Sequence, residues 1–402
     1  MREIKLKNNI SACIKRNNNT PRTALAMNIS VVKPEKFSGL YFMMNRLLLK
    51  GTEKYSSKDI SEILDENAIE LSTEMKYDYI RFRFVALNED FEKALSVLND
   101  IILNSTFEEF EKEKVKLNGE LLAELDSAKV RVSDLFGRTI FKNHFYGHSY
   151  TTVLEQIDNI TKEDVKEAYW YLLGNSKKIL TLVGDIDYDK AEELLNNYLG
   201  VIPESKDLPS EIPCPENTGR EYSEFIKDDA QQAQIIQGWR VASVDSEDYT
   251  KLMLLNVILG ASGLSSRLFL ELREKKGLAY TVRSSYDNRQ KASVFSIYIG
   301  TEPSNIETSI AGFKEEIDKI KTIPVSPEEL HSAKNNLIGK QQFITETNSQ
   351  QANTMAYYAI SGKPFNYQEQ VRESIMKITP EEITECAKKY FTDDYVLTIL
   401  KP

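Results

Sequence analysis

Apolar and polar residues alternate along this chain with two different periods, and the two periods predict both strands and helices. In residues 79–87, apolar side chains alternate with Arg81 and Arg83, and this period of two is typical of a half-buried strand. Residues 91–103 and 110–125 instead repeat apolar side chains every three or four positions, which predicts amphipathic helices. Further apolar runs that predict strands lie at residues 179–183, 294–300 and 395–400. The mixture predicts an α+β fold in which helices cover each sheet on one face.

The chain also repeats itself once. Residues 160–168 (Ile-Thr-Lys-Glu-Asp-Val-Lys-Glu-Ala) are similar to residues 378–386 (Ile-Thr-Pro-Glu-Glu-Ile-Thr-Glu-Cys), 218 positions later. Each copy places a threonine before an acidic turn, which is the usual start of a helix. A second match, 220 positions apart, pairs Phe110, Lys114 and Leu117 with Leu330, Lys334 and Leu337. Two matches at nearly the same offset predict tandem homologous domains.

The boundary between the domains is predicted at residues 203–219. This stretch contains four prolines, with Ser, Asp, Glu and Gly among them, which is the composition of a linker. We therefore expect an N-terminal domain over residues 1–202 and a C-terminal domain over residues 220–402.

Charge, hydropathy and cysteine content argue against nucleic-acid-binding, membrane-spanning and disulfide-bonded classes of protein. The net charge of −10 over 402 residues leaves no basic surplus to neutralise phosphates, so we expect no nucleic-acid partner. No stretch approaches the roughly 18 apolar residues of a membrane span, and the N-terminus lacks the apolar core of a signal peptide. Cys13, Cys214 and Cys386 are far apart in the sequence and form neither a Cys-x-x-Cys pair nor an even-numbered framework. We therefore expect reduced thiols. We expect a cytoplasmic protein that does not contact a membrane.

Residues 39–52 carry a family resemblance. They read Gly-Leu-Tyr-Phe-Met-Met-Asn-Arg-Leu-Leu-Leu-Lys-Gly-Thr. This frame resembles the segment Gly-Leu-x-His-x-x-Glu-His-x-x-x-Lys-Gly-Thr of the insulinase-like peptidases, the pitrilysin and mitochondrial-processing-peptidase family, whose inverted His-x-x-Glu-His motif binds zinc. Phe42 and Arg46 stand at the two histidine positions, and Asn45 stands at the glutamate position. Because Phe and Arg cannot ligate zinc and Asn is no general base, the resemblance implies a degenerate zinc site without a metal in this chain.

The third zinc ligand of the family is a glutamate about 75 residues further on. Glu120 is the favoured counterpart, and Glu124 is the alternative if the register shifts by one helical turn. Residues 39–49 otherwise fit a buried helix, in which the charge of Arg46 is costly unless it is paired. We therefore expect Arg46 to pair with Glu120, and Glu120→Ala to destabilise the protein markedly.

Histidine is too scarce to build a metal centre elsewhere. The chain contains His144, His148 and His331 only. The first two are spaced by four, but Gly147 lies between them in a segment with loop character, so we interpret both as loop histidines.

Residues 263–280 carry the second part of the resemblance. They read Gly-Leu-Ser-Ser-Arg-Leu-Phe-Leu-Glu-Leu-Arg-Glu-Lys-Lys-Gly-Leu-Ala-Tyr and are similar to the C-domain signature of the family. The resemblance places the substrate-contacting Arg and Tyr of the family at Arg273 and Tyr280. The residues themselves predict a helix over 265–276, a stop at Gly277 and a strand from Tyr280. A guanidinium and a phenol are both donors suited to substrate carbonyls or a developing oxyanion.

The resemblance covers nearly the whole chain, because residues 184–187 and 144–147 also look like family elements. It implies two tandem domains of the LuxS/MPP-like metallohydrolase fold. It further implies the non-zinc subunit of a heterodimeric peptidase acting on peptides, with zinc held by a homologous partner and Arg273 and Tyr280 supplied in trans. A peptide-binding or scaffold protein without proteolysis is the alternative. The peptide substrate, the identity of the partner and the choice between homodimer and heterodimer stay open.

Overall fold

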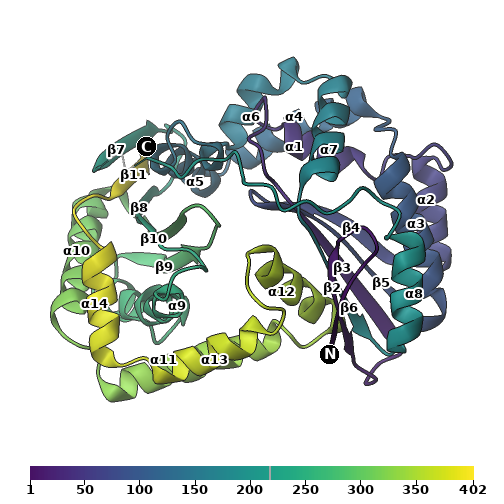
Figure 1. Ribbon diagram of the computed structural model, residues 1–402. Helices are drawn as coiled ribbons and strands as arrows, with labels where there is room; N and C mark the ends of the chain where they lie inside the picture. The colour runs from purple at the N-terminus through teal and green to yellow at the C-terminus, as the bar shows by residue number, and fades with distance from the viewer. Residues whose placement is uncertain (217–218) are drawn as a thin grey trace. The chain divides into compact units, whose positions relative to one another are not determined.

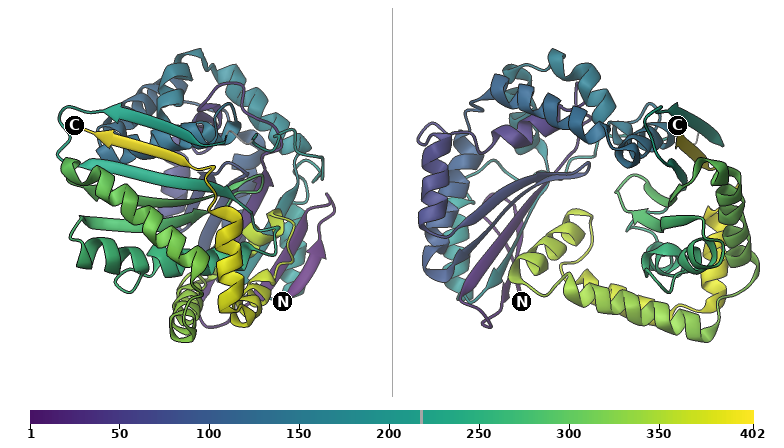
Figure 2. Two further views of the ribbon diagram at one scale, coloured as in Figure 1. Left: turned by 90° about the vertical axis from the view of Figure 1, so that its left-hand side faces the viewer. Right: turned by 180° about the vertical axis from the view of Figure 1, so that it is seen from behind.

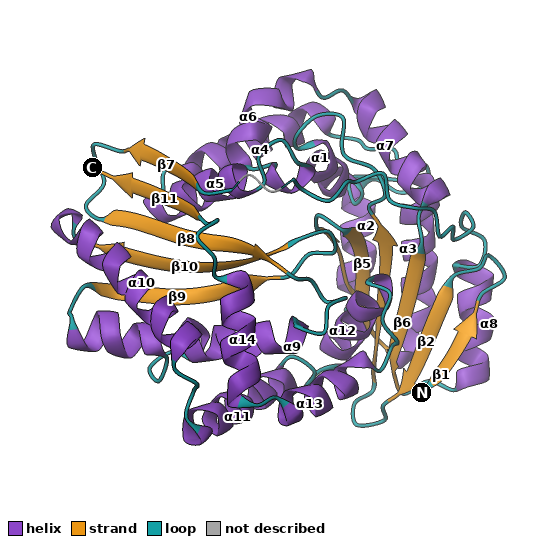
Figure 3. Ribbon diagram, turned by 60° about the vertical axis from the view of Figure 1, so that its left-hand side comes forward, coloured by secondary structure: helices purple, strands orange, loops and turns teal. Residues whose placement is uncertain are grey.

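The computed structural model describes residues 1–216 and 219–402, and each of its two compact units is built on one β-sheet (Figures 1 and 3). The first unit consists of Met1–Glu120, Thr152–Ile212 and Phe343–Gln368. The second unit consists of Leu121–Thr151, Pro213–Gln342 and Glu369–Pro402. Each unit therefore takes one segment from the opposite half of the sequence.

The sheet of the first unit has six strands in the order β1-β2-β6-β3-β5-β4. The strands are β1 (Arg2–Lys5), β2 (Ser11–Arg16), β3 (Arg22–Ser30), β4 (Glu70–Met75), β5 (Tyr79–Leu87) and β6 (Lys178–Gly184). β2 and β6 are parallel, and the other neighbours are antiparallel. Every residue of the central strand β6 is buried.

Helices cover both faces of this sheet, so the prediction that helices cover one face only is wrong here. The cover of the second face comes from the C-terminal half of the sequence, which a local pattern does not reveal. The helices from the first half of the sequence are α1 (Leu40–Leu47), α2 (Ser57–Glu66), α3 (Phe91–Asn104), α4 (Phe110–Leu125), α6 (Tyr150–Gln156), α7 (Lys162–Asn175) and α8 (Tyr188–Tyr198), with short 3₁₀ turns at Asn88–Asp90 and Ile157–Asn159. α3 and α8 pack on one face, and α12 (Asn348–Ile360) packs on the other, against β3 and β6 (Figure 2). α12 buries Met355 and Ala356 against a cluster that includes Cys13, Ala26 and Val183.

The packing of α12 changes one prediction about β5. Arg81 was expected on a solvent-facing side, but only 7% of its surface is exposed. Its guanidinium donates to the Oδ1 of Asn28 at 3.0 Å and to the carbonyl of Asn353, on α12, at 3.4 Å. The expected half-buried strand is therefore covered on both sides at Arg81.

The sheet of the second unit has five strands in the order β7-β11-β8-β10-β9. The strands are β7 (Glu221–Ile226), β8 (Ala233–Val241), β9 (Ala279–Asp287), β10 (Ser293–Thr301) and β11 (Val396–Lys401). The helices are α5 (Ala128–Ile140), α9 (Tyr249–Asn256), α10 (Ile306–Thr322), α11 (Pro327–Phe343), α13 (Tyr367–Lys377) and α14 (Pro380–Tyr390), with π-helical segments η4 (Val257–Ala261) and η5 (Phe269–Lys275) and 3₁₀ turns at Phe145–Gly147 and Pro303–Asn305. α5 packs against β7, β8 and β11, whereas α9, η4 and η5 pack against β9.

The predicted repeat is confirmed in the contacts as well as in the strand order. Lys114 of α4 donates to the carbonyls of Asp158 and Ile160 at 3.1 and 3.2 Å. Lys334 of α11 makes the same two bonds, to Met376 and Ile378, at 2.9 and 2.6 Å. The helices that follow, α7 and α14, begin with the same capping box, at Thr161 and at Thr379. The chain is thus a pair of homologous α+β domains.

The repeat also explains the composition of the two units. α5 and α12 have the same length and start 220 positions apart, at Ala128 and Asn348, so they are equivalent elements of the two repeats. α5 lies on the sheet formed by residues 221–401, and α12 lies on the sheet formed by residues 2–184. The two repeats have therefore exchanged the same helix.

Membrane insertion through a helix finds no support in this fold. In the part of the chain that the structure describes, no helix combines the length and the apolar character that crossing a bilayer requires.

Candidate functional site

The helix that carries the degenerate zinc motif is α1, in the first unit. Its N-cap is Gly39, which has a φ of 94°, and its apolar side chains Met43, Met44 and Leu47 are buried. Phe42 is 40% exposed. The Oδ1 of Asn45 is buried without a hydrogen-bond partner among the described residues. α1 therefore has the packing of a structural helix and presents one charged side chain, Arg46.

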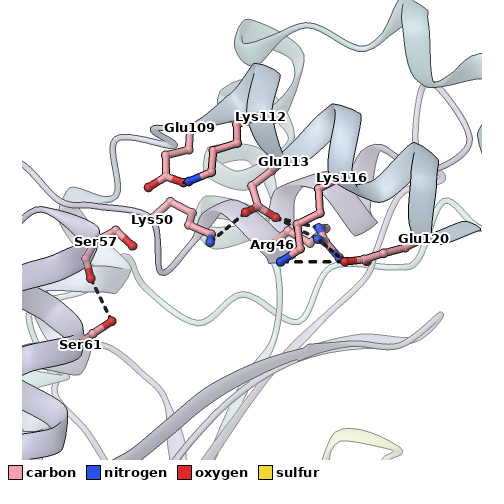
Figure 4. A network of polar contacts seen from close by, with 9 residues as sticks. All are labelled: Arg46, Lys50, Ser57, Ser61, Glu109, Lys112, Glu113, Lys116 and Glu120. Carbon is pink, nitrogen blue, oxygen red and sulfur yellow. Dashed lines mark hydrogen bonds and ion pairs between the residues drawn. The ribbon is translucent and has the colours of Figure 1, made fainter.

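Arg46 is the centre of an ion cluster between α1 and α4 (Figure 4). Its Nη1 lies 2.8 Å from Oε2 of Glu120, so the predicted pair is present. Its Nη2 lies 2.9 Å from Oε2 of Glu113, and Lys50 binds the other oxygen of Glu113 at 2.9 Å. The carboxylate partners of Arg46 are thus Glu113 and Glu120, and Glu124 is not one of them.

Glu113 is the member of the cluster that the sequence interpretation missed. Its side chain is 3% exposed, whereas that of Glu120 is 45% exposed and that of Arg46 is 22% exposed. Burial by itself raises the pKa of Glu113, but Lys50 and Arg46 outweigh this effect and lower the pKa below its ordinary value. The spacing of the two acids contained part of the signal, because Glu113 and Glu120 are seven apart on α4 and therefore lie on one helix face. Lys50 lies beyond the end of α1, so helical spacing does not predict its contact with Glu113.

The cluster does not fit a zinc ion. A zinc site of this kind needs three ligands and an open fourth position, and here a guanidinium lies between the carboxylates. Among residues 1–216 and 219–402, no group of three or more His, Cys, Asp or Glu side chains could hold a metal ion. His144 instead bonds the carbonyl of Pro213 at 2.9 Å and accepts from the N–H of Tyr146 at 3.0 Å, as a loop histidine does. The charge of two carboxylates is balanced by two cations rather than by a metal.

The second candidate feature is the turn that joins η5 to β9 in the second unit. Gly277 has a φ of 61°, and its N–H bonds the carbonyl of Arg273 at 3.1 Å, which ends the helix where the sequence predicts. The helix expected over residues 265–276 is π-helical from Phe269 to Lys275. Strand β9 then begins at Ala279, one residue before Tyr280.

Tyr280 lies in a β-bulge. Thr301 pairs with Ala279 and Gly300 pairs with Thr281, so Tyr280 is the extra residue in β9. Its side chain is 83% exposed, and its phenol has no hydrogen-bond partner among the described residues. A bulge of this kind redirects a side chain away from the pleat, and it leaves one carbonyl outside the ladder.

Arg273 binds that carbonyl. Its Nη1 donates to the carbonyl oxygen of Tyr280 at 2.9 Å, and its guanidinium lies 4.7 Å from the ring centroid of Phe269. The structure therefore brings the two predicted residues together, with Arg273 supporting the backbone of the residue that presents the phenol. The Nε of Arg273 also lies 3.9 Å from Oε1 of Glu274, in an exposed ion pair in which the Arg273 side chain is 39% exposed.

Comparisons with known proteins identify the family and the fold of this chain. A family model described as "Insulinase (Peptidase family M16)" matches residues 13–152, and one described as "Peptidase M16 inactive domain" matches residues 159–337. A Bacillus subtilis protein named "Uncharacterized zinc protease YmxG" is 25% identical over 91% of this chain and 89% of its own length. A Helicobacter pylori protein named "Non-peptidase homolog YmxG" is 26% identical over 88% of this chain and 82% of its own length.

Solved structures share the fold over the whole chain. A protease from Helicobacter pylori superimposes with a TM-score of 0.90 at 20% identity, covering 100% of this chain and 99% of the other. A peptidase M16 inactive domain from Pseudomonas fluorescens gives a TM-score of 0.90 at 19% identity, covering 100% and 98%. At these identities the likeness establishes the fold and leaves the chemistry to the residues.

Proposed function

Since the chain belongs to the insulinase (M16) peptidase family and its own zinc site is degenerate, we propose that it is the non-zinc subunit of a cytoplasmic, heterodimeric peptidase. A homologous partner would supply the His-x-x-Glu-His motif, the zinc ion and the general base. This chain would supply Arg273 and Tyr280 to peptides bound by the pair.

The observation that carries the proposal is the difference between the zinc-motif helix α1, which lacks its chemical groups, and the turn at Arg273 and Tyr280, which keeps them. Helix α1 has neither the two zinc-binding histidines nor the glutamate of the family motif, and its Arg46 is part of an ion cluster. The turn between η5 and β9 instead keeps an exposed phenol on a bulge, supported by an arginine on the preceding helical turn. A phenol that is exposed and supported in this way can donate to a bound peptide, which favours a catalytic subunit over a scaffold.

The chemistry assigned to this turn is hydrogen bonding to a peptide carbonyl. A phenol donates one hydrogen bond, and a bond that strengthens as a carbonyl oxygen becomes an oxyanion lowers the reaction barrier. Arg273 acts first as a positioning residue, because it fixes the backbone of Tyr280 through the 2.9 Å bond to the carbonyl. The charge of its guanidinium is partly balanced by Glu274, whose Oε1 lies 3.9 Å from Nε.

Complementation tests the proposal. The chain, mixed with a zinc-complete homologue from the same cell, should raise turnover of a fluorogenic peptide above that of the homologue alone. Loss of one oxyanion donor typically costs about 10²–10³ in rate, so Tyr280→Phe and Arg273→Ala should each lower the turnover strongly. Gel filtration should show that both variants still form the pair.

Matched controls separate the role of the phenol from general surface effects. Tyr222 is another exposed tyrosine of the second unit, at 57%, and Tyr222→Phe should leave turnover unchanged. Phe42→Ala should also matter little. Full activity of Tyr280→Phe and Arg273→Ala in a stable pair would refute the proposed role and favour the peptide-binding scaffold instead.

Metal content gives a second, independent test. The purified chain should hold no stoichiometric zinc, because Phe42, Asn45 and Arg46 replace the ligands and the base. Elemental analysis of the chain and of the reconstituted pair should find zinc in the pair only. About one tightly bound zinc ion per chain in the isolated protein would contradict the proposal.

A further inference from the structure

Beside Tyr280, the open face of β9 and β10 carries two cations that have no acidic partner. Thr281, Arg283 and Ser285 of β9 are exposed, whereas the intervening Val282 and Ser284 are buried against helices. The side chain of Arg283 makes no hydrogen bond or ion pair with any described residue, although its backbone belongs to the ladder with β10. Its guanidinium lies 5.7 Å from the ring centroid of Tyr298, its cross-strand neighbour on β10.

The second cation comes from α5. The Nζ of Lys129 lies 5.6 Å from the same Tyr298 ring, and Lys129 likewise forms no ion pair with a described residue. The nearby acid is already neutralised, because Asp287 binds Arg289 at 2.7 Å. This part of the face therefore carries two uncompensated positive charges, in a protein whose net charge is −10.

Arg283 lines a hollow, and Lys129 lies near it, against the ring of Tyr298, which lines the same hollow. A groove of about 220 Å³ lies between α5 and the sheet, and its polar lining consists of Ser133, Arg283, Ser285, Ser296, Tyr298 and the ion pair of Asp287 with Arg289. The hydroxyls of Ser285 and Ser296 lie 2.9 Å apart. Hydroxyls and cations around a small hollow are the groups that bind a carboxylate.

The position of β9 indicates how a peptide would reach the groove. β9 is the last strand in the order of its sheet (Figure 3), so an extended peptide can pair with its free edge. Side chains directly opposite on neighbouring strands have Cβ atoms about 4.5–5.5 Å apart, and alternate side chains face the same way. A peptide residue opposite Arg283 would thus place its side chain on the open face.

We propose that Arg283 and Lys129 form a subsite for an acidic side chain, Asp or Glu, of an extended peptide paired with β9. The subsite rests on the proposed function, because it adds a sequence preference to the same peptide-binding role. It assigns Arg283 and Lys129 to specificity and leaves the oxyanion contact to Tyr280. The preferred ligand is a peptide with an acidic residue a few positions from the residue that contacts Tyr280.

Direct binding to the full chain tests the subsite without the partner. The probes are fluorescein-labelled peptides rich in Val and Thr, blocked at both ends, each with one Glu, and a matched set with Gln. The Glu peptides should bind the wild-type chain about threefold to tenfold more tightly than the Gln peptides, and added salt should weaken this preference. Arg283→Gln and Lys129→Gln should each reduce the preference, and the double variant should abolish it.

Control variants and contrary results complete the test of the subsite. Arg372→Gln removes an exposed cation of α13 and should leave the preference unchanged, and Arg283→Lys should retain part of it. Equal binding of Glu and Gln peptides to the wild type, or a preference that survives in the double variant, would overturn the subsite. A third set, Gln peptides with a free C-terminus, identifies the source of the carboxylate. Tight binding of this set that depends on Arg283 and Lys129, without a preference for the blocked Glu peptides, would overturn the subsite, because the bound group would then be the chain end.

The same measurements separate the two proposals. If Tyr280→Phe lowers turnover of the reconstituted pair while Glu and Gln peptides bind alike, the proposed function stands and the subsite fails. If the pair shows no peptidase activity but the Glu preference depends on Arg283 and Lys129, the subsite stands and the peptidase role fails.

Discussion

A single arginine, Arg46, shows how a metal helix becomes a structural one. Its guanidinium bridges Glu113 and Glu120 across two helices, at 2.9 and 2.8 Å. The two contacts differ in weight, because exposed pairs are screened by solvent and buried charges are not. The exposures shift the expected contribution to stability from Glu120, whose side chain is 45% exposed, to the buried acid Glu113.

Substitution of these acids tests that ranking. Glu113→Ala leaves Arg46 and Lys50 without their buried partner and should lower the free energy of unfolding by about 3–5 kcal/mol. Glu120→Ala should cost no more than about 1 kcal/mol. Glu111, an exposed acid on the same helix, provides the control, and Glu111→Ala should have almost no effect. Urea denaturation at neutral pH gives the three values, and equal losses for Glu113 and Glu120 would contradict the ranking.

A second residue, Asp248, makes stability depend on pH. Burial raises its pKa, but Lys389, Lys251 and Tyr390, at 2.6, 2.9 and 2.9 Å, outweigh burial and lower the pKa to about 2. Because the pKa is lower in the folded state than the roughly 3.9 of an unfolded chain, the carboxylate stabilises the fold above about pH 4. This contribution, about 2–3 kcal/mol, is lost as the pH falls from about 4 to about 2.

The measurement for Asp248 compares wild type with Asp248→Asn. The variant should be less stable at pH 7, and the difference should shrink when both proteins are measured at progressively lower pH. A difference that stays constant down to about pH 2 would show that the ionised carboxylate is not the source of the stability.

At the scale of elements, the sequence predicted the strands and helix starts that depend on neighbouring residues alone. The strands at 79–87 and 294–300 and the helix starts at Thr161 and Thr379 are present because alternation and capping act within a few residues. The burial of Arg81 was missed because its cover, α12, lies 272 residues further on. The bulge at Tyr280 was missed because only the register with β10 reveals the extra residue. In the ion cluster, Arg46–Glu120 followed from the family frame. The spacing of Glu113 and Glu120 puts both acids on one face of α4, but the burial of Glu113 and its contact with Lys50 depend on how the elements pack.

The repeated lysines allow equivalent elements to be compared. Lys114 and Lys334 each bind two carbonyls just before the following helix. Lys114→Met and Lys334→Met should each lower the free energy of unfolding, by about 1–3 kcal/mol, because the substitution leaves carbonyls without their charged donor. The two losses should be alike. Thermal or urea denaturation checks this, and an effect at one site only would argue that the two contacts are not equivalent.

At the scale of the whole molecule, the exchanged helices decide how the chain holds together. Each unit contains a helix from the opposite half of the sequence, and these helices bury apolar side chains such as Ala356, which is fully buried. Burial of apolar surface is the main favourable term in association as in folding. Covalent continuity through residues 203–212 is thus not the main link between the halves.

Cleavage between the repeats tests this link. A specific protease site inserted after Leu208, which is 49% exposed, should yield two fragments that elute together in gel filtration and separate only in denaturant. Ala356→Asp buries a charge under α12 and should let the cleaved fragments separate under native conditions. An uncleaved Ala356→Asp protein shows whether the variant still folds. Fragments that part at once after cleavage of the wild type would contradict the role of the exchanged helices.

The exchange also sets the order of events during synthesis on the ribosome. The last strand of the first sheet ends at Gly184, but the helix that covers its second face ends at Ile360, 176 residues later. At a translation rate of about 5–20 residues per second, roughly 9 to 35 s pass between the two. During that interval the apolar face that includes Ala26, Ile179 and Val183 has no cover from its own chain. The nascent protein therefore exposes an apolar surface for several seconds. We expect holding chaperones to bind this surface before the C-terminal repeat emerges.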